Sequence, residues 1–319
     1  MRKLFTGQFD YIHARKICWY ITLGLMVVGL LFNIIFGTEM DISFKGGTLV
    51  KYSYSGTADT SAVASAIETA TGHKVDVQTS ESAGIALLNV YTTDVLTMDD
   101  QQAITDALNK AYPDGNFHAE DASSLTASKG KMFFVKCLVA VALASAFLVL
   151  YVAIRFRKIG GWTAGVMALV ALLHDLAIAY FAFVIFRIPL NDNFVAVLLT
   201  ILGYSLNDTL VTYDRIRENR TLMRDADLPT IVNDSLNQCF RRNVNTALST
   251  VIAVGTVAVV ALVMRLDSIT SFAIPMLFGL ISGFYSSTFL CAPTWVLWEE
   301  KREAKAALKA KAKGKGKRK

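Results

Sequence analysis

The sequence predicts a polytopic α-helical membrane protein with six transmembrane helices and one small α+β domain outside the membrane. Its 319 residues are 53% apolar and 18% charged, whereas average soluble domains are about 45–50% apolar and about 25% charged. Apolar runs long enough to cross the roughly 30 Å hydrocarbon core of a bilayer recur along the chain. One long polar segment interrupts them. These observations argue against an ordinary soluble enzyme.

The first span is predicted at residues 17–36, a run of twenty residues without a charged side chain. At 1.5 Å per residue a helix of this length matches the hydrocarbon core. Basic residues precede the run, but no small-residue cleavage site follows it, so we expect an uncleaved anchor and not a removed signal peptide. The five further spans are predicted at residues 132–154, 162–186, 194–213, 246–264 and 269–298.

Lys and Arg near spanning segments are retained in the cytoplasm, so their distribution predicts the orientation. With the N-terminus inside, the cytoplasmic segments hold 23 basic residues, and the two short outer loops hold one each, Arg187 and Arg265. This predicts that both termini and the loop 214–245 are cytoplasmic. The basic tail, residues 299–319, alternates Lys with Ala and Gly, which predicts disorder and contact with anionic lipids. The other cytoplasmic segments are residues 1–16 and the short connection between the second and third spans.

The inserted segment, residues 37–131, carries 6 basic and 13 acidic residues and is predicted to be extracytoplasmic. Its hydrophobic pattern alternates between strand and helix in the order β-α-β-β-α-β, which suggests a small ferredoxin-like sandwich. It contains no cysteine and no Ser/His/Asp arrangement, so we expect it to bind or move and not to catalyse. No cofactor, metal site or nucleic-acid partner is predicted. The elements are expected at residues 48–54, 60–71, 74–79, 85–92, 98–112 and 117–122.

Ionisable side chains inside the membrane are functional candidates by default, because each costs a few kcal/mol to insert. In the fourth span Thr200, Tyr204, Asn207 and Asp208 follow helical spacing and predict one polar stripe. Asp208 lies about 21 Å from the outer end of that span, in the cytoplasmic half. A purely structural role in helix packing is the alternative, and function is favoured over it. Arg241 and Arg242 precede the fifth span. Either arginine can extend its charged end to the membrane surface or reach Asp208.

In the third span His174 and Asp175 lie close to the predicted midplane. An imidazole and a carboxylic acid at that depth can exchange protons, or they can hydrogen-bond neighbouring helices and hold the bundle together. Both interpretations remain open. The sixth span carries Gly279, Gly283 and Ser287 at intervals of four, with Ser282 and Ser286 beside them. This small-residue face is expected to pack inside its own bundle.

Four short motifs stand out along the chain: Asp41-Ile42-Ser43-Phe44-Lys45-Gly46-Gly47-Thr48, Ala171-Leu172-Leu173-His174-Asp175, Gly203-Tyr204-Ser205-Leu206-Asn207-Asp208-Thr209, and Asn237-Gln238 with Arg242 and Thr246. Through these motifs the sequence resembles, over nearly the whole chain, the SecF family of protein-export membrane subunits within the RND superfamily. Ser43 stands where many members carry Asp, which puts any charge-dependent role of that position in doubt.

The resemblance implies a six-span, RND-type half that pairs with SecD and assists the SecYEG channel in the bacterial cytoplasmic membrane. It further implies that proton flow drives late export of preproteins, with Asp208 as proton carrier and Arg242 as its partner. Under this interpretation the protein is not an enzyme. Two alternatives are a half of an RND-type small-molecule exporter and a non-transporting assembly scaffold. The exporters typically carry two outer domains of several hundred residues, whereas one much smaller domain is predicted here.

Overall fold

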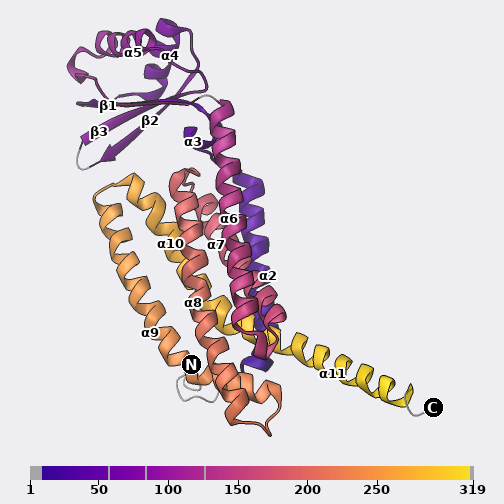
Figure 1. Ribbon diagram of the computed structural model, residues 1–319. Coiled ribbons are helices and arrows are strands. Elements are labelled where there is room, and N and C mark those ends of the chain that lie inside the picture. The colour runs from indigo at the N-terminus through magenta and orange to yellow at the C-terminus, as the bar shows by residue number, and fades with distance from the viewer. Residues whose placement is uncertain (1–8, 57, 83–84, 126, 317–319) are drawn as a thin grey trace.

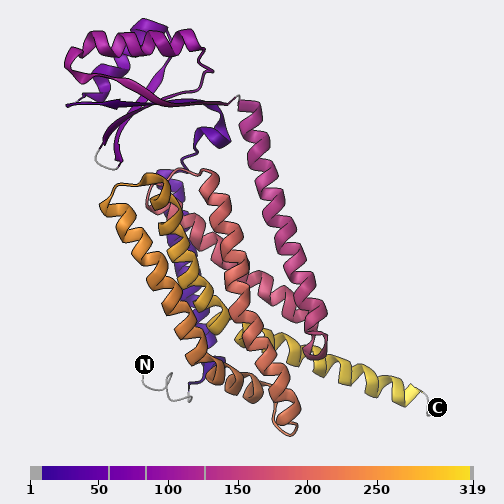
Figure 2. The ribbon, with the colours of Figure 1, turned by 60° about the vertical axis from the view of Figure 1, so that its left-hand side comes forward.

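The computed structural model describes residues 9–56, 58–82, 85–125 and 127–316. It consists of a bundle of long helices with a small α+β domain at one end (Figure 1). The beginning of the first long helix and the C-terminal helix both lie at the other end of the bundle, away from the domain (Figure 2). The domain and the described termini therefore lie on opposite sides of the bundle.

Six helices in the described residues are long and apolar enough to cross a membrane. The third and fourth, α7 and α8, are the most buried and form the centre of the bundle, whereas α2, α6 and α9 expose most of their apolar surface. The helices are α2 (Tyr11–Phe36), α6 (Ala127–Arg155), α7 (Gly161–Ile185), α8 (Asp192–Leu222), α9 (Leu228–Val263) and a last segment that begins with α10 (Asp267–Tyr285).

The segment 214–245, predicted as a cytoplasmic loop, is helical apart from the turn at residues 223–227. Pro229 lies in the first turn of α9, where its missing N–H leaves no hydrogen bond unmade. Across the turn Asn219 Nδ2 of α8 donates to Ser235 Oγ of α9 at 2.8 Å. Hydropathy marked the apolar part of each helix and not the ends of the helices, and α8 and α9 form one long antiparallel hairpin.

The end of the chain also differs from the prediction. After α10 the helix widens into a π-helix, Ser286–Cys291, and continues as α11, Ala292–Gly316. α11 leaves the bundle sideways at the end opposite the domain (Figures 1 and 2). The prediction of a disordered tail is therefore wrong for the tail as far as Gly316. Ala, Lys and Glu are strong helix formers, and here the propensity of the backbone outweighs the repulsion of like charges. Residues 317–319 lie outside the described part.

The outer domain has the predicted element order β-α-β-β-α-β. Its sheet has the order β2-β3-β1-β4 with every neighbouring pair antiparallel. Helices α4 and α5 cover the face of the sheet that points away from the bundle (Figure 1), and apolar side chains of both layers form a core separate from that of the bundle. The elements are β1 (Gly47–Tyr54), α4 (Thr60–Thr71), β2 (Val75–Ser82), β3 (Ile85–Thr92), α5 (Met98–Ala111) and β4 (His118–Leu125).

The first motif joins the domain to the bundle. The short helix α3 (Ile42–Lys45) places the buried Phe44 ring against Phe133 and Phe134 of α6. A side chain at Gly130 of α6 would meet backbone atoms of residues 44 and 46 at about 3 Å, so the two segments touch backbone to backbone. Asp41 N donates to the Leu190 carbonyl at 2.9 Å, which ties the motif to the α7–α8 connection as well. The side chain of Ser43 lies outside the described part.

The two glycines of this motif are required by the backbone. Gly46 and Gly47 have φ angles of +80° and +124°, which other residues rarely adopt. A Cβ on Gly47 would also lie 2.3 Å from the Thr92 carbonyl oxygen of β3. The glycine pair therefore lets the chain turn sharply from α3 into the centre of the sheet.

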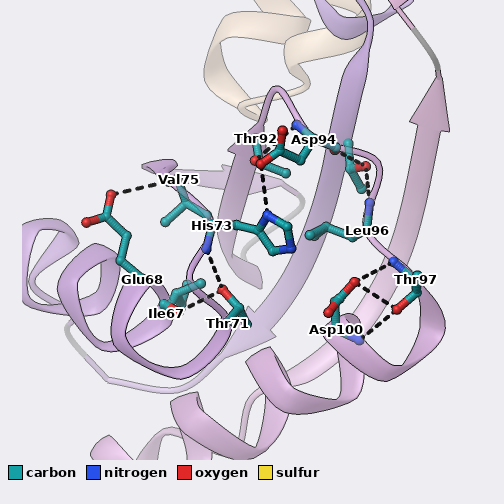
Figure 3. A network of polar contacts seen from close by, with 11 residues as sticks. Ile67, Glu68, Thr71, His73, Val75, Thr92, Asp94, Leu96, Thr97 and Asp100 are labelled. Atoms are coloured by element: carbon teal, nitrogen blue, oxygen red, sulfur yellow. Dashed lines mark hydrogen bonds and ion pairs between the residues drawn. The ribbon is translucent and has the colours of Figure 1, made fainter.

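A polar network fixes the loop between β3 and α5 (Figure 3). Thr48 Oγ1 donates to the Asp94 carbonyl at 2.8 Å and accepts from Leu96 N at 3.1 Å. Thr97 and Asp100 then form a reciprocal capping box at the start of α5, which satisfies amides that would otherwise lack partners. The hydrogen bond from the Thr97 backbone lowers the pKa of the Asp100 carboxyl below its usual value of 3.8.

We expect Thr97→Ala to speed amide hydrogen exchange in the first turn of α5 roughly fivefold, because the helix loses its N-cap. Exchange followed by mass spectrometry measures this in the whole protein. Thr69→Ala is the matched control, because the Thr69 hydroxyl bonds only within its own helix α4. Because folding lowers the pKa of Asp100, its carboxylate contributes to the stability of the folded domain above pH 3.8. This contribution is lost as the pH falls through the lower pKa of the folded state. Equal exchange in both variants at neutral pH contradicts the assignment.

Candidate functional site

Asp208 lies inside the bundle on α8 with 2% of its surface exposed. Its Oδ2 atom is buried and has no hydrogen-bond partner among the described residues. A carboxylate in this position is expensive to keep charged. The site therefore contains a buried acid whose charge the surrounding helices leave incompletely satisfied.

Arg242 of α9 lies level with Asp208 because of the α8–α9 hairpin. The thiol of Cys239 donates to the Val211 carbonyl at 3.9 Å, which sets the register of the two antiparallel helices. Asp208 and Arg242 each lie three residues further from the turn, at the same level of the hairpin, and the arginine charge is near enough to act on the carboxylate. No hydrogen bond or ion pair joins the two side chains among the contacts of the described residues, so their pairing stays a prediction.

A polar cavity of about 570 Å³ lies between α8 and α9 on the side of the hairpin turn. Arg242 lines it together with Val211, one turn from Asp208. Within the cavity Arg215 pairs with Glu218 at 2.6 Å, and Arg217 pairs with Asp214 at 2.7 Å. The cavity lies towards the end of the bundle opposite the outer domain, and its lining includes Arg242 but not Asp208. The lining residues are Val211, Asp214, Arg215, Arg217, Glu218, Gln238, Cys239 and Arg242.

The predicted polar stripe on α8 divides between two faces. Asp208 points into the bundle, whereas Thr200 and Asn207 are exposed on the bundle surface. Gly203 lies between them and has no atom within 4 Å of the place where a side chain would begin. Tyr204 is half-buried. The strip formed by Thr200, Gly203 and Asn207 is thus exposed in an otherwise apolar span.

Asp175 of α7 is fully buried and accepts hydrogen bonds from serines of three other elements. Oδ2 accepts from Ser205 of α8 at 2.5 Å and from Ser286 of the π-helix at 2.7 Å. Oδ1 accepts from Ser282 of α10 at 2.6 Å and lies 3.0 Å from His174 Nδ1. The Asp175 carboxylate is therefore fully hydrogen-bonded, in contrast to that of Asp208.

Close helix packing makes this arrangement possible. A Cβ on Gly279 of α10 would lie 2.0 Å from Ile201 Cδ1, and a Cβ on Gly283 would lie 3.0 Å from Ser205 Cβ. The small-residue face of the sixth span thus packs against α8 inside its own bundle, as the sequence predicted. That contact holds Ser205 and Ser282 on either side of the Asp175 carboxylate.

Comparison with known proteins gives the family. Residues 104–301 match the family described as "Protein export membrane protein SecD/SecF, C-terminal". The chain is 31% identical over 304 residues to the protein translocase subunit SecF of Alicyclobacillus acidocaldarius, covering 94% of this chain and 96% of that one. This chain belongs to the SecD/SecF family.

A longer relative is the protein translocase subunit SecDF of Bacillus subtilis, 31% identical over 296 residues. That match covers 92% of this chain and 38% of the relative, so this chain spans well under half of the longer SecDF protein. The crystal structure of SecDF from Thermus thermophilus, described as a translocon-associated membrane protein, has the same fold. Its TM-score is 0.76 at 24% identity, with 92% of this chain and 39% of that chain covered.

Two motif residues of this SecD/SecF chain have roles that the sequence did not reveal. Asn237 Oδ1 accepts from Phe9 N at 3.2 Å, and its amide donates back to the Phe9 carbonyl at 2.9 Å. Gln238 Oε1 accepts from Arg215 at 2.5 Å and from Asn219 at 2.9 Å. The motif thus connects the chain start and the α8–α9 cavity to the helix that carries Arg242.

Three functional candidates were missed in the sequence. Ser282 and Ser286 were assigned to a packing face, because their spacing does not reveal a carboxylate on a distant helix. Glu299 of α11 is 1% exposed, accepts from Thr163 at 2.7 Å and pairs with Arg302 at 2.5 Å. It fixes the start of α11 to the start of α7. In the sequence, the available signal for Glu299 was an acidic residue directly after an apolar span.

Among the described residues no group of three or more His, Cys, Asp or Glu side chains is placed to hold a metal ion.

We expect Gly279→Ala to destabilise the helix bundle of this chain by about 1–3 kcal/mol, because the added methyl group overlaps the Ile201 side chain. Thermal unfolding in detergent, followed by the loss of monodisperse protein, measures the change. Gly255→Ala on α9 is the control, since its nearest neighbouring atom lies at 3.9 Å. A wild-type melting temperature for Gly279→Ala would contradict the close contact between α8 and α10.

Proposed function

We propose that this chain is a SecF-type subunit of the Sec protein translocase that uses the proton motive force to promote late export of polypeptides. It has no catalytic activity of its own in this proposal. The family membership and the multi-pass helical architecture support the general role. The observation that supports proton coupling is the buried and incompletely hydrogen-bonded Asp208, level with Arg242 beside a polar cavity.

In this proposal Asp208 carries the proton. When ionised, the carboxylate is attracted by Arg242 and draws α8 and α9 together. When it is protonated, that attraction ends and the hairpin is free to change its packing. One charge that crosses the membrane potential provides about 2.3 kcal/mol per 100 mV, which is enough to bias a bundle with two nearly balanced arrangements.

The remaining candidates have separate roles. Asn207 is exposed beside Asp208 and contributes to the surface that meets a partner, and not to the buried site. His174 and Asp175 belong to the α7 centre and exchange protons there. The polar cavity supplies Asp208 with water from the cytoplasmic side, in a topology with both termini in the cytoplasm of a bacterial cell.

The proposed partner within the membrane is SecD, either as a separate chain or fused as in SecDF relatives. The strip formed by Thr200, Gly203 and Asn207 supports this, because exposed polar groups at membrane depth need a protein neighbour. Docking of SecD here places its helices directly against the helix that carries Asp208. Protonation and partner contact then act on the same element.

The outer domain, in this proposal a ferredoxin-like sandwich, contacts the exported preprotein beside SecYEG. Its sheet is held to the bundle by the α3 motif and by α6, so a change in bundle packing reaches it through rigid segments. At the other end α11 is proposed to lie along anionic lipid headgroups, since the tail carries ten basic residues from Lys301 onward.

We expect Asp208→Asn to abolish the acceleration of export by an imposed proton gradient while the protein still assembles with SecD. The asparagine keeps the shape of the side chain and cannot take up a proton. Completion of export of a secretory protein into membrane vesicles, with and without the gradient, measures this. Asp192→Asn, an exposed acid in the first turn of the same helix, is the control and should respond as wild type. If Asp208→Asn keeps its gradient response, a scaffold function replaces the proposal.

We expect Gly203→Leu to reduce copurification of SecD roughly tenfold, because the new side chain occupies the open strip where the partner helix approaches. Gly24→Leu on α2 is the matched control, since Gly24 also lies in open space. Quantitative pull-down from solubilised membranes compares the two. Equal SecD recovery from both variants would place the partner on another face.

A further inference from the structure

Asp175 accepts as many hydrogen bonds as a carboxylate can hold. Four donors surround its two oxygens at 2.5 to 3.0 Å, and they come from α7, α8, α10 and the π-helix. Because three of the donors are serine hydroxyls, this carboxylate joins α8, α10 and the π-helix to α7. Hydrogen bonds to a charged group are worth more than neutral ones, so the strength of this junction depends on the charge of Asp175.

The groups around Asp175 contain no strong counter-ion. The sole ion-pair partner of Asp175 in the described part of the chain is His174. Ser205 is contributed by α8, which carries Asp208 three residues further on. Ser282 is contributed by α10, and the π-helix contributes Ser286 and the nearby Cys291 thiol. Uptake of a proton by Asp175 removes the charge to which all three serines donate, and so weakens the three bonds together.

A route for that proton starts at His174. Its Nδ1 atom lies 3.0 Å from Asp175 Oδ1, while its Nε2 atom is buried without a hydrogen-bond partner. The ring also lines a cavity of about 270 Å³ between α2 and α7, whose other lining side chains are mostly apolar. Imidazole passes a proton by accepting it at one nitrogen and releasing it from the other. His174 is thus placed to pass a proton to or from Asp175.

The π-helix gives the junction a movable part. Ser286 is its first residue and Cys291 its last, and α11 follows directly. A π-helix has looser backbone hydrogen bonding than an α-helix and is frequent at functional sites. Here its first turn is held to α7 by the Ser286–Asp175 bond, and its last residue lies 3.2 Å from the Tyr213 hydroxyl of α8.

We propose that Asp175, Ser205, Ser282 and Ser286 form a second proton-responsive site, which clamps α8, α10 and the π-helix onto α7 while Asp175 is charged and releases them when it is neutral. The inference rests on the proposed proton coupling and extends it to a residue beyond Asp208. Transfer of a proton from His174 Nδ1 to Asp175 Oδ1 breaks the N–H bond, forms one O–H bond and reverses the hydrogen bond between the two side chains. The three serines then donate to a neutral carboxyl group, and such hydrogen bonds are weaker than those to a carboxylate.

The test uses Cys291 as a reporter in full-length protein reconstituted with SecD, after Cys18 and Cys137 are replaced by alanine and Cys239 by serine, which keeps a donor for the Val211 carbonyl. Cys291 is 1% exposed, so it reacts slowly with a membrane-permeant maleimide while the clamp is closed. We expect Asp175→Asn and Ser286→Ala each to raise the labelling rate about tenfold, because the first removes the buried charge and the second removes a hydrogen bond to it. Ser287→Ala is the matched control, since that buried serine donates to the Phe284 carbonyl and not to Asp175.

Ser286→Ala must also change the external pH at which an imposed gradient half-maximally accelerates export, which a serine that only packs would not do. Unchanged Cys291 labelling, or an unchanged pH profile, in Ser286→Ala overturns the inference. If Asp175→Asn does not fold, the result for the milder variant Ser286→Ala decides the test.

The second proton-responsive site and the proposed function can fail separately. If Asp208→Asn loses the gradient response while Ser286→Ala behaves as Ser287→Ala, the proton coupling stands without the second site. If Asp208→Asn keeps the response, the proposed function fails first.

Discussion

A carboxylate inside an apolar bundle must receive its hydrogen bonds and counter-charges from the protein, because lipid supplies neither. This constraint shapes the centre of the molecule. Asp175 meets it completely, with serines from three neighbouring elements. Asp208 meets it incompletely, with one buried oxygen unpartnered and an arginine charge nearby. The two acids therefore differ in how strongly the fold responds to the loss of their charge.

Small residues and a long hairpin create these two environments. Gly279 and Gly283 bring α10 so close to α8 that serine hydroxyls, which are short, reach Asp175 from both sides. The α8–α9 hairpin runs past the ends of the predicted apolar spans, and its register brings Asp208 and Arg242 to one level. Both features depend on backbone geometry and not on long, flexible side chains. The positions of the polar groups are thus coupled to the packing of whole helices.

The outer domain is attached to this centre at two points. Phe44 packs against α6, where Gly130 allows backbone contact, and Asp41 binds the α7–α8 connection through its amide. These contacts join the domain to α6 and to the connection that precedes α8. At the opposite end buried Glu299 hydrogen-bonds Thr163 and so joins α11 to α7. The bundle is thus in direct contact with the elements at both of its ends.

The sequence by itself determined the membrane-protein class, the number of apolar helices and the strand and helix order of the inserted segment. These follow from local hydrophobic length and period, which neighbours in the fold change little. It also indicated Asp208, Asp175 and Arg242, because ionisable residues are rare within or beside spans. It misplaced the helix ends at 214–245 and in the tail, since hydropathy reports burial in lipid and helices extend into water.

Tertiary structure alone decided which polar groups meet. Ser282 and Ser286 lie more than a hundred residues from Asp175, and no periodicity within one helix connects them. The same holds for the division of the α8 stripe into buried Asp208 and exposed Asn207, because an isolated helix does not specify which neighbour covers each face. The local sequence pattern determines whether a segment forms an apolar helix. The contacts between helices determine which of its charged side chains receive hydrogen bonds or counter-charges, and hence which of them can respond to a proton.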